Sequence, residues 1–207
     1  MSVHKWAVAV LVAGAVLTSE ASAQDKAVSL QLRGGSFHGI SHLNDAHTAN
    51  LQKRGFNAGA GVNAEFSKYF AIRGDVNLAR NELELNNVET GRDLSRLFYD
   101  ASLQFQYPIN ESFKPYIFVG AGAVTLHPTG TEDADKTTFA GTGGLGVTYT
   151  VPGTGFGIGV EGKSWLYQFK DVGGQFAAYD KMQFDATWGA TISYRIPVGS
   201  QHVRASR

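Results

Sequence analysis

Charged side chains recur at alternate positions in several segments of this chain, and these residues carry its clearest chemical signal. Residues two apart on an extended strand point to the same face. Four basic and five acidic residues fall on such faces: Arg33, Arg73, Lys163, Arg195, Glu65, Asp75, Asp100, Glu161 and Asp185. Buried charges must pair with opposite charges and form hydrogen bonds. The set therefore predicts a salt-bridged network enclosed by strands, and a narrow ion path through that network is the alternative.

Two other patterns carry weaker chemical signals. Imidazole and carboxylate groups can hold zinc or copper, and one polar segment contains four of them: His38, His42, Asp45 and His47. Gly141, Gly143 and Gly146 match a dinucleotide-binding spacing, but the residues after them continue a strand pattern instead of opening a helix. Nothing in the sequence fixes the geometry of the histidine segment. We therefore expect no metal and no cofactor.

Strict alternation of apolar and polar residues predicts the strands that must position these side chains. The segment 184–196 alternates throughout, and it is longer than the roughly five or six residues of an ordinary soluble strand. It fits a tilted strand that crosses a bilayer in roughly 9–11 residues. The same pattern gives eight segments: 28–37, 56–66, 70–80, 97–107, 115–126, 138–149, 156–169 and 184–196.

The connections between these segments alternate in length. Three are short and four are long and polar: 67–69, 108–114 and 151–155, against 38–55, 81–96, 127–137 and 170–183. This order predicts an all-β fold, an eight-stranded antiparallel up-and-down transmembrane β-barrel with both termini at the short-turn, periplasmic end. An eight-stranded barrel has room only for its own side chains, so we expect the charged residues to plug it. The alternative is a soluble barrel such as a lipocalin, with its apolar face around a ligand.

The start of the chain has the features of an export signal. His4 and Lys5 precede an apolar run at 7–17, and Ala21-Ser22-Ala23 forms a small-residue cleavage site. We expect a cleaved signal peptide at 1–23, a barrel at 24–197 and a short polar tail at 198–207. The absence of cysteine excludes a disulfide framework. The 18 basic and 18 acidic residues balance, so nothing favours nucleic acid as a partner.

Three segments resemble the small OmpA/OmpX-type outer-membrane β-barrel family, which includes opacity-like surface proteins: KPYIFVGAG at 114–122, GGLGVTY at 143–149 and TWGATISY at 187–194. The resemblance implies a protein surrounded by outer-membrane lipid. In the last segment, Thr187, Gly189, Ile192 and Tyr194 resemble the terminal signal that the barrel-assembly machinery reads. Many family members end on an aromatic residue, whereas this chain continues into the polar tail. Assembly would therefore have to read an internal signal.

The resemblance fixes location better than activity. We expect an integral outer-membrane protein with an envelope-structural or surface-interaction role, whose long loops could bind an extracellular ligand. A small passive, porin-like channel is the alternative. A lipid A-modifying enzyme is less favoured, because it needs a nucleophile, a base and an orienting acid near the membrane edge. The resemblance implies that a deacylase of this family carries a histidine and a serine two apart on a strand, whereas we expect no strand here to contain a histidine. His127 could pair with a loop carboxylate, but the sequence predicts no enzyme.

Overall fold

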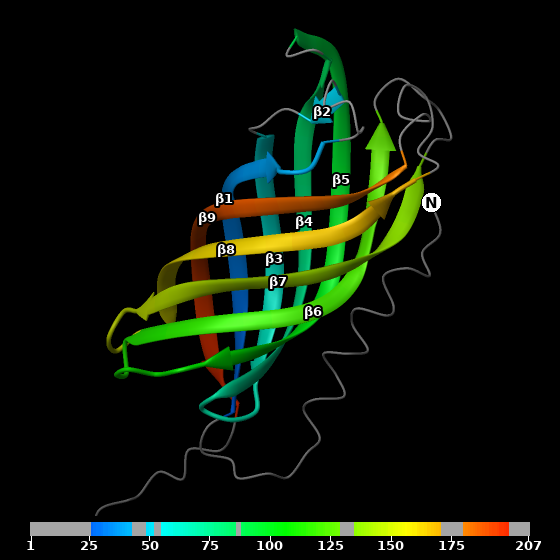
Figure 1. Cartoon of the computed structure of the whole chain (residues 1–207). Helices are drawn as coiled ribbons and strands as arrows, with labels where there is room; N and C mark the ends of the chain where they lie inside the picture. Colours follow the sequence, from blue (N-terminus) through cyan, green and yellow to red (C-terminus); the bar gives the residue numbers. More distant parts are fainter. Residues whose placement is uncertain are drawn as a thin grey trace, which may run out of the picture.

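The chain closes into a single ring of antiparallel strands (Figure 1). The computed structural model describes residues 26–42, 49–51, 55–85, 88–128, 135–170 and 180–198. Its strands are β1 (Ala27–Gly39), β2 (Ala49–Leu51), β3 (Gly55–Glu65), β4 (Phe70–Leu85), β5 (Val88–Gln106), β6 (Phe113–Pro128), β7 (Lys136–Thr150), β8 (Phe156–Phe169) and β9 (Lys181–Pro197). The ring runs β1, β3, β4, β5, β6, β7, β8, β9, and β9 pairs back onto β1. The expected eight-stranded up-and-down barrel is confirmed, with β2 as a short extra strand on β4.

Some sequence-based expectations concern residues that lie outside the described part of the chain. These are the signal peptide, Asp45 and His47 of the histidine segment, and residues 199–207 of the tail. The short connections join β3 to β4, β5 to β6 and β7 to β8, and they lie at the same end of the barrel as the start of β1. We call this the short-turn end, and the opposite end the long-loop end.

The strands extend further than expected at the long-loop end. Much of the segment 81–96, predicted as a loop, is a two-stranded ribbon of β4 and β5 in which Glu82 pairs with Asp93. Alternating polarity predicts a strand only where one face is buried. The two strands of a ribbon satisfy each other's backbone hydrogen bonds without a buried face, so this ribbon carries no such pattern. β1 and β6 are also longer, so His38 and His127 lie within strands. The expectation that no strand contains a histidine is therefore wrong.

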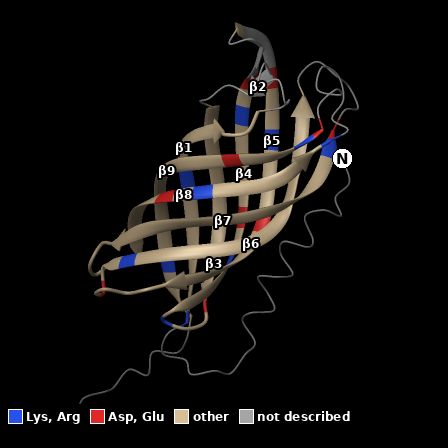
Figure 2. Ribbon diagram, viewed as in Figure 1, with Lys and Arg blue, Asp and Glu red and all other residues tan. Residues whose placement is uncertain are grey.

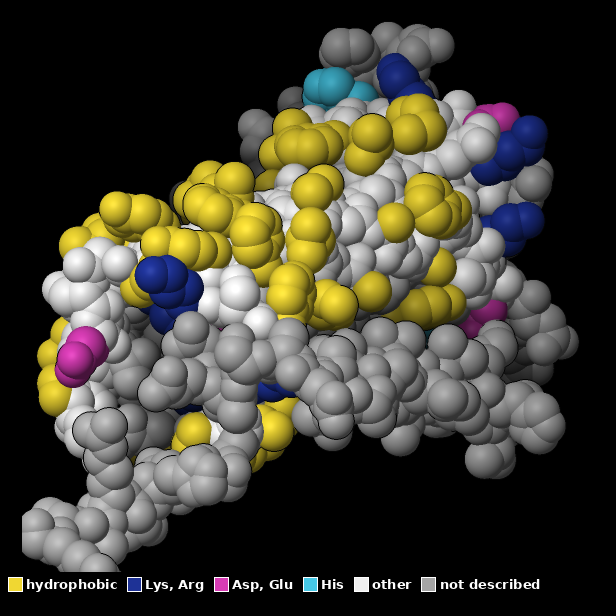
Figure 3. Space-filling view, turned by 90° about the horizontal axis from the view of Figure 1, so that it is seen from below, with side chains coloured by type: hydrophobic (Ala, Val, Ile, Leu, Met, Phe, Trp, Pro, Cys, Tyr) yellow, Lys and Arg dark blue, Asp and Glu magenta, His cyan; other side chains and the backbone are white. Residues whose placement is uncertain are grey.

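The outer wall of the barrel is apolar, and Figure 3 shows hydrophobic side chains spread along it. Large exposed examples come from several strands: Leu32, Leu103, Phe139 and Trp188. In β6, Ile117 and Val119 are exposed on this wall, while Tyr116 and Phe118 are buried on the inner side. This settles the orientation of β6, which alternation leaves open because both of its faces are apolar. The described residues include no helix that is long and apolar enough to cross a membrane.

The inner wall depends on glycine where β1 and β9 meet. A Cβ atom at Gly35 would lie 2.1 Å from the backbone oxygen of Trp188, closer than any real side chain allows. Gly35 is paired with Gly189 across the two strands, and glycine in a strand permits such close approach. The neighbouring Gly34 is different, since a Cβ there would have its nearest neighbour 4.0 Å away.

Candidate functional site: the barrel interior

Six charged side chains meet inside the barrel, and we call them the central cluster: Arg33, Arg73, Asp75, Asp100, Glu161 and Lys163. Asp75 is the hub. Its Oδ1 atom lies 2.7 Å from Arg33 Nη2, and its Oδ2 atom lies 2.7 Å from both Arg73 Nε and Lys163 Nζ. The side chains of all six residues are at most 4% exposed. Such burial is tolerable only because each charge has a close partner of opposite sign.

The other two carboxylates of the central cluster also accept hydrogen bonds from buried donors. Glu161 accepts a hydrogen bond from Arg73 at 2.7 Å and another from the Tyr116 hydroxyl at 2.8 Å. Asp100 accepts one from Lys163 Nζ at 2.8 Å. Three cations and three anions give the cluster no net charge. Figure 2 shows basic and acidic positions on strands across the middle of the barrel.

An apolar layer packs beside the central cluster on its long-loop side. Phe98 stacks on Trp165 with ring centroids 4.3 Å apart, and Phe37 lies 6.1 Å from Phe98. Trp165 Nε1 also donates to Asp100 Oδ2 at 3.3 Å, which ties the layer to the cluster. We call this the aromatic layer, and its other buried members are Ala79, Leu94, Val124, Leu126, Ala140, Tyr167 and Phe169. Sequence reasoning missed it, because simple alternation assigns aromatic residues to the lipid face.

A second ion pair packs against the aromatic layer toward the long-loop end. Arg96 Nη1 lies 2.7 Å from Asp185 Oδ2, and the Tyr167 hydroxyl donates to the same oxygen at 2.6 Å. Arg96 Nη2 also donates to Asn81 Oδ1 at 3.0 Å. Arg96 was missed because it falls in the segment predicted as a loop. Arg96 is two residues from Phe98, which also points inward, and this spacing could have identified Arg96 as an interior residue.

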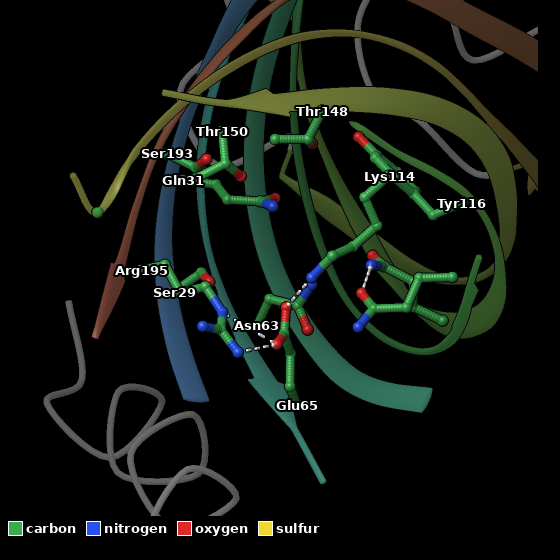
Figure 4. A pocket seen from close by; sticks show the side chains of 13 residues that line it. Ser29, Gln31, Asn63, Glu65, Lys114, Tyr116, Thr148, Thr150, Ser193 and Arg195 are labelled. Atoms are coloured by element: carbon green, nitrogen blue, oxygen red, sulfur yellow. Dashed lines mark hydrogen bonds and ion pairs between the residues drawn. The ribbon is translucent and has the colours of Figure 1, made fainter. Parts of the chain in front are cut away.

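A third group of charges lies at the short-turn end of the interior. Glu65 lies 2.8 Å from Lys114 Nζ and 2.9 Å from Arg195 Nη2 (Figure 4). Lys114 was missed because it ends a predicted turn. A cavity of about 30 Å³ opens beside these residues, lined by polar side chains that include Gln31 and Asn63. This volume holds about two water molecules, which is far too little for a hydrated solute.

The structure divides the nine charged residues predicted for the network among three separate groups. Six form the central cluster, Asp185 pairs with Arg96, and Glu65 binds Arg195 at the short-turn end. The residues of the predicted assembly signal all lie on β9. Thr187 is buried on the inner wall, whereas Ile192 and Tyr194 are exposed on the outer wall; Gly189 packs against β1.

The two strand histidines have partners on the outer side of the barrel. His38 Nε2 lies 2.9 Å from Ser36 Oγ. His127 Nδ1 contacts the carboxylate of Asp135, and both of these side chains are more than half exposed. Among the described residues, no group of three or more histidine, cysteine, aspartate or glutamate side chains is arranged to hold a metal ion.

Comparison with solved structures finds similarity to small outer-membrane barrels. Neisserial surface protein A superposes with a TM-score of 0.53 at 13% identity, covering 82% of this chain and 96% of that chain. The attachment invasion locus protein Ail of Yersinia pestis, solved with the heparin analogue sucrose octasulfate, gives 0.49 at 16% identity, covering 84% and 100%. The outer membrane enzyme PagL gives 0.45 at 13% identity, covering 81% and 99%. At 13% identity, the likeness to neisserial surface protein A shows the fold alone.

Sequence comparison gives the family. No curated protein matches the chain. The model of the outer membrane protein beta-barrel domain matches residues 8–195, which is most of the sequence. The match agrees with the closed barrel, its apolar outer wall and its polar interior, and it gives the outer membrane as the location. The chain belongs to the outer membrane protein beta-barrel domain family.

Proposed function

We propose that the protein is a plugged outer-membrane barrel with an envelope-structural or surface-interaction role, and that it does not conduct ions or solutes. The observation that carries this proposal is the central cluster, in which three cations and three anions contact one another across the lumen. An ion could cross only by separating pairs that are held at 2.7–2.8 Å and shielded from water. Breaking one buried pair costs about 3–5 kcal/mol.

The aromatic layer adds a second barrier in series with the central cluster. Its stacked rings are buried and leave Trp165 1% exposed, so a hydrated ion would have to lose water to enter. The Arg96–Asp185 pair lies beside this layer with both side chains 0% exposed. These features favour a rigid scaffold over the porin-like alternative, since a solute has to pass both barriers.

Liposome swelling tests this proposal against the channel alternative. Vesicles containing the folded protein and an impermeant dextran are diluted into isosmotic solutions of small sugars, amino acids or salts. We expect swelling at the rate of protein-free vesicles for every solute. Swelling that falls with increasing solute size would contradict the plug and favour a passive channel.

A surface-interaction role requires the long-loop end to face outward. We propose that residues 1–23 are a cleaved signal peptide, that the termini are periplasmic, and that the barrel-assembly machinery reads the end of β9. The observation that supports this orientation is the β4–β5 ribbon, which continues the sheet at the long-loop end beyond the ion pair of Arg80 and Asp93 (Figure 1). Its pairing with β2 gives an extracellular ligand a structured platform.

Two cysteine substitutions test this orientation, because the chain has no native cysteine. Val88 at the ribbon end is 65% exposed and Ile109 in a short turn is 59% exposed, so the sites are matched in accessibility. On intact cells, a membrane-impermeant maleimide should label Val88→Cys and should label Ile109→Cys only after the outer membrane is permeabilised. The reverse pattern would contradict periplasmic termini.

A further inference from the structure

The cavity at the short-turn end, which we call the mouth cavity, has more positive than negative charge in its lining. Its described lining contains two basic residues, Lys114 and Arg195, and one acidic residue, Glu65, which gives a net charge of +1. Lys114 contacts one oxygen of the Glu65 carboxylate at 2.8 Å, and Arg195 contacts the other at 2.9 Å (Figure 4). The central cluster, by contrast, is neutral. A surplus of positive charge in a concave site favours an anionic ligand.

Both cations of the mouth cavity are open to water and have donors to spare. The side chains of Lys114 and Arg195 are 22% and 40% exposed, so a ligand can reach them. The ammonium group of Lys114 has three N–H donors, and one of them binds Glu65. Arg195 binds Glu65 through Nε and Nη2, which leaves Nη1 for a ligand. A second carboxylate at the mouth can therefore accept charge-assisted hydrogen bonds from both cations.

Three buried amide side chains around the mouth cavity have hydrogen-bonding capacity left over. Gln31, Asn63 and Gln104 line the cavity and are at most 7% exposed. The amide oxygen of each accepts no hydrogen bond within the described part of the chain, and an unpaired buried acceptor is destabilising. Rotation of a side-chain amide exchanges its acceptor oxygen and its donor nitrogen, and Figure 4 shows Gln31 extending from β1 into the cavity. These side chains suit a ligand that carries N–H groups beside its anionic group.

The size and position of the mouth cavity restrict the ligand further. The cavity holds about two water molecules, which is the size of a carboxylate group. Tyr116 lies on its inner side and donates to Glu161 of the central cluster, so a ligand enters from the short-turn end and stops there. The anionic group therefore enters first, and the rest of the molecule stays outside. A lipid headgroup does not suit this site, because its acyl chains would have to leave the bilayer to follow it.

We propose that the mouth cavity binds the free carboxylate at the C-terminal end of an extended peptide. Lys114 and Arg195 bind the carboxylate, and the side-chain amides bind the peptide N–H groups that follow it. This binding goes beyond the scaffold role proposed above. The orientation proposed above places this end in the periplasm, and it decides only the compartment in which the peptide is met. The binding itself can be tested on purified protein, so it can fail or hold independently of that orientation.

Glu65 has a particular role in this site, because it competes with the ligand for the same two cations. Its carboxylate already binds Lys114 and Arg195, which lowers their attraction for a second carboxylate. Replacing Glu65 by glutamine removes the competitor and raises the net charge of the lining from +1 to +2. Peptide binding should then tighten, whereas neutralising either cation should weaken it. A purely structural role of these residues does not predict effects of opposite sign.

The test uses the full mature protein, isotope-labelled and folded into lipid nanodiscs. The probe is N-acetyl-trialanine with a free carboxylate, and its controls are the same peptide with a C-terminal amide, and sodium acetate. Each is titrated at low salt, and the dissociation constant is taken from the chemical-shift changes of the protein's amides. Heat-modifiability on gels shows that each variant is folded. The comparison of acid and amide needs the wild type alone, so it stands even where a variant fails to fold.

The proposal expects saturable shifts around the mouth cavity with the free-carboxylate peptide, and binding about ten-fold or more weaker for the amide. Lys114→Gln and Arg195→Gln should each weaken binding about two- to five-fold, and Glu65→Gln should tighten it by a similar factor. Arg80→Gln, which removes an exposed cation at the long-loop end, should leave binding unchanged. Equal binding of acid and amide, no binding at all, or weaker binding to folded Glu65→Gln would overturn the proposal. Acetate that binds as tightly as the peptide would also overturn it, in favour of a general small-anion site.

Discussion

Replacing Asp75 by asparagine removes one negative charge from the central cluster while keeping the size of the side chain. Asp75 lies 2.7 Å from atoms of Arg33, Arg73 and Lys163, and its side chain is 0% exposed. After the substitution, these three cations face only the carboxylates of Asp100 and Glu161. Removing one partner of a buried pair costs about 3–5 kcal/mol. Because three cations lose a partner here, we expect the upper end of that range.

The free energy of unfolding in lipid vesicles measures this loss. Urea titrations can be followed through the fluorescence of Trp165 inside the barrel and Trp188 on its wall. Arg80→Ala is the matched control, because it breaks a pair whose arginine side chain is 58% exposed, and exposed pairs contribute at most about 1 kcal/mol. A loss for Asp75→Asn no larger than that for Arg80→Ala would refute the claim that the cluster is dry and tightly paired.

Three further substitutions test other parts of the fold. Gly35→Ala places a Cβ 2.1 Å from a backbone oxygen of β9, so the folded band on a heat-modifiability gel should be lost or weakened, while Gly34→Ala should fold normally. Tyr167→Phe removes the 2.6 Å hydrogen bond to Asp185 and should cost about 1.5–3 kcal/mol in urea titrations; no change would mean that the carboxylate is solvated. Val119→Arg places a charge on the wall at a residue 68% exposed and should cost about 2–4 kcal/mol in vesicles; a neutral result would contradict its location in the hydrocarbon core.

The barrel itself could be predicted because period-two alternation and loop length are local signals. The run 184–196 alternates cleanly, and it is found as a strand within Lys181–Pro197. The inward charges follow from the same spacing, since Arg73 and Asp75 are two apart on one strand. Which charges contact each other could not be predicted, because that depends on register across the ring. Asp185 pairs with Arg96 of β5, which is not its neighbour in the sheet.

The aromatic layer and the long-loop ribbon show where alternation fails. Trp165, Leu166 and Tyr167 form an apolar run on β8, so hydrophobicity alone cannot assign a face. Counting residues along the strand can assign the face, because residues an even number apart point to the same side. Trp165 is two residues from the inward Lys163, and Phe37 is four residues from the inward Arg33. The hydrogen bond between Ser36 and His38 was missed because the predicted strand ended at residue 37, two residues before the end of β1 at Gly39. The alternation of polar and apolar residues does not mark where a strand ends. The end of β1 is set by its backbone pairing with β9.

Single-channel recording in a planar bilayer tests the central claim most directly, because it detects even a narrow path through the interior. The mature wild-type protein is inserted at high salt and held at voltages of both signs, after a heat-modifiability gel has shown that it is folded. The plugged barrel predicts a silent baseline with no reproducible step. Steady openings of uniform size that change when Arg33, Arg73 and Lys163 are neutralised would contradict it, because those residues would then line an ion path.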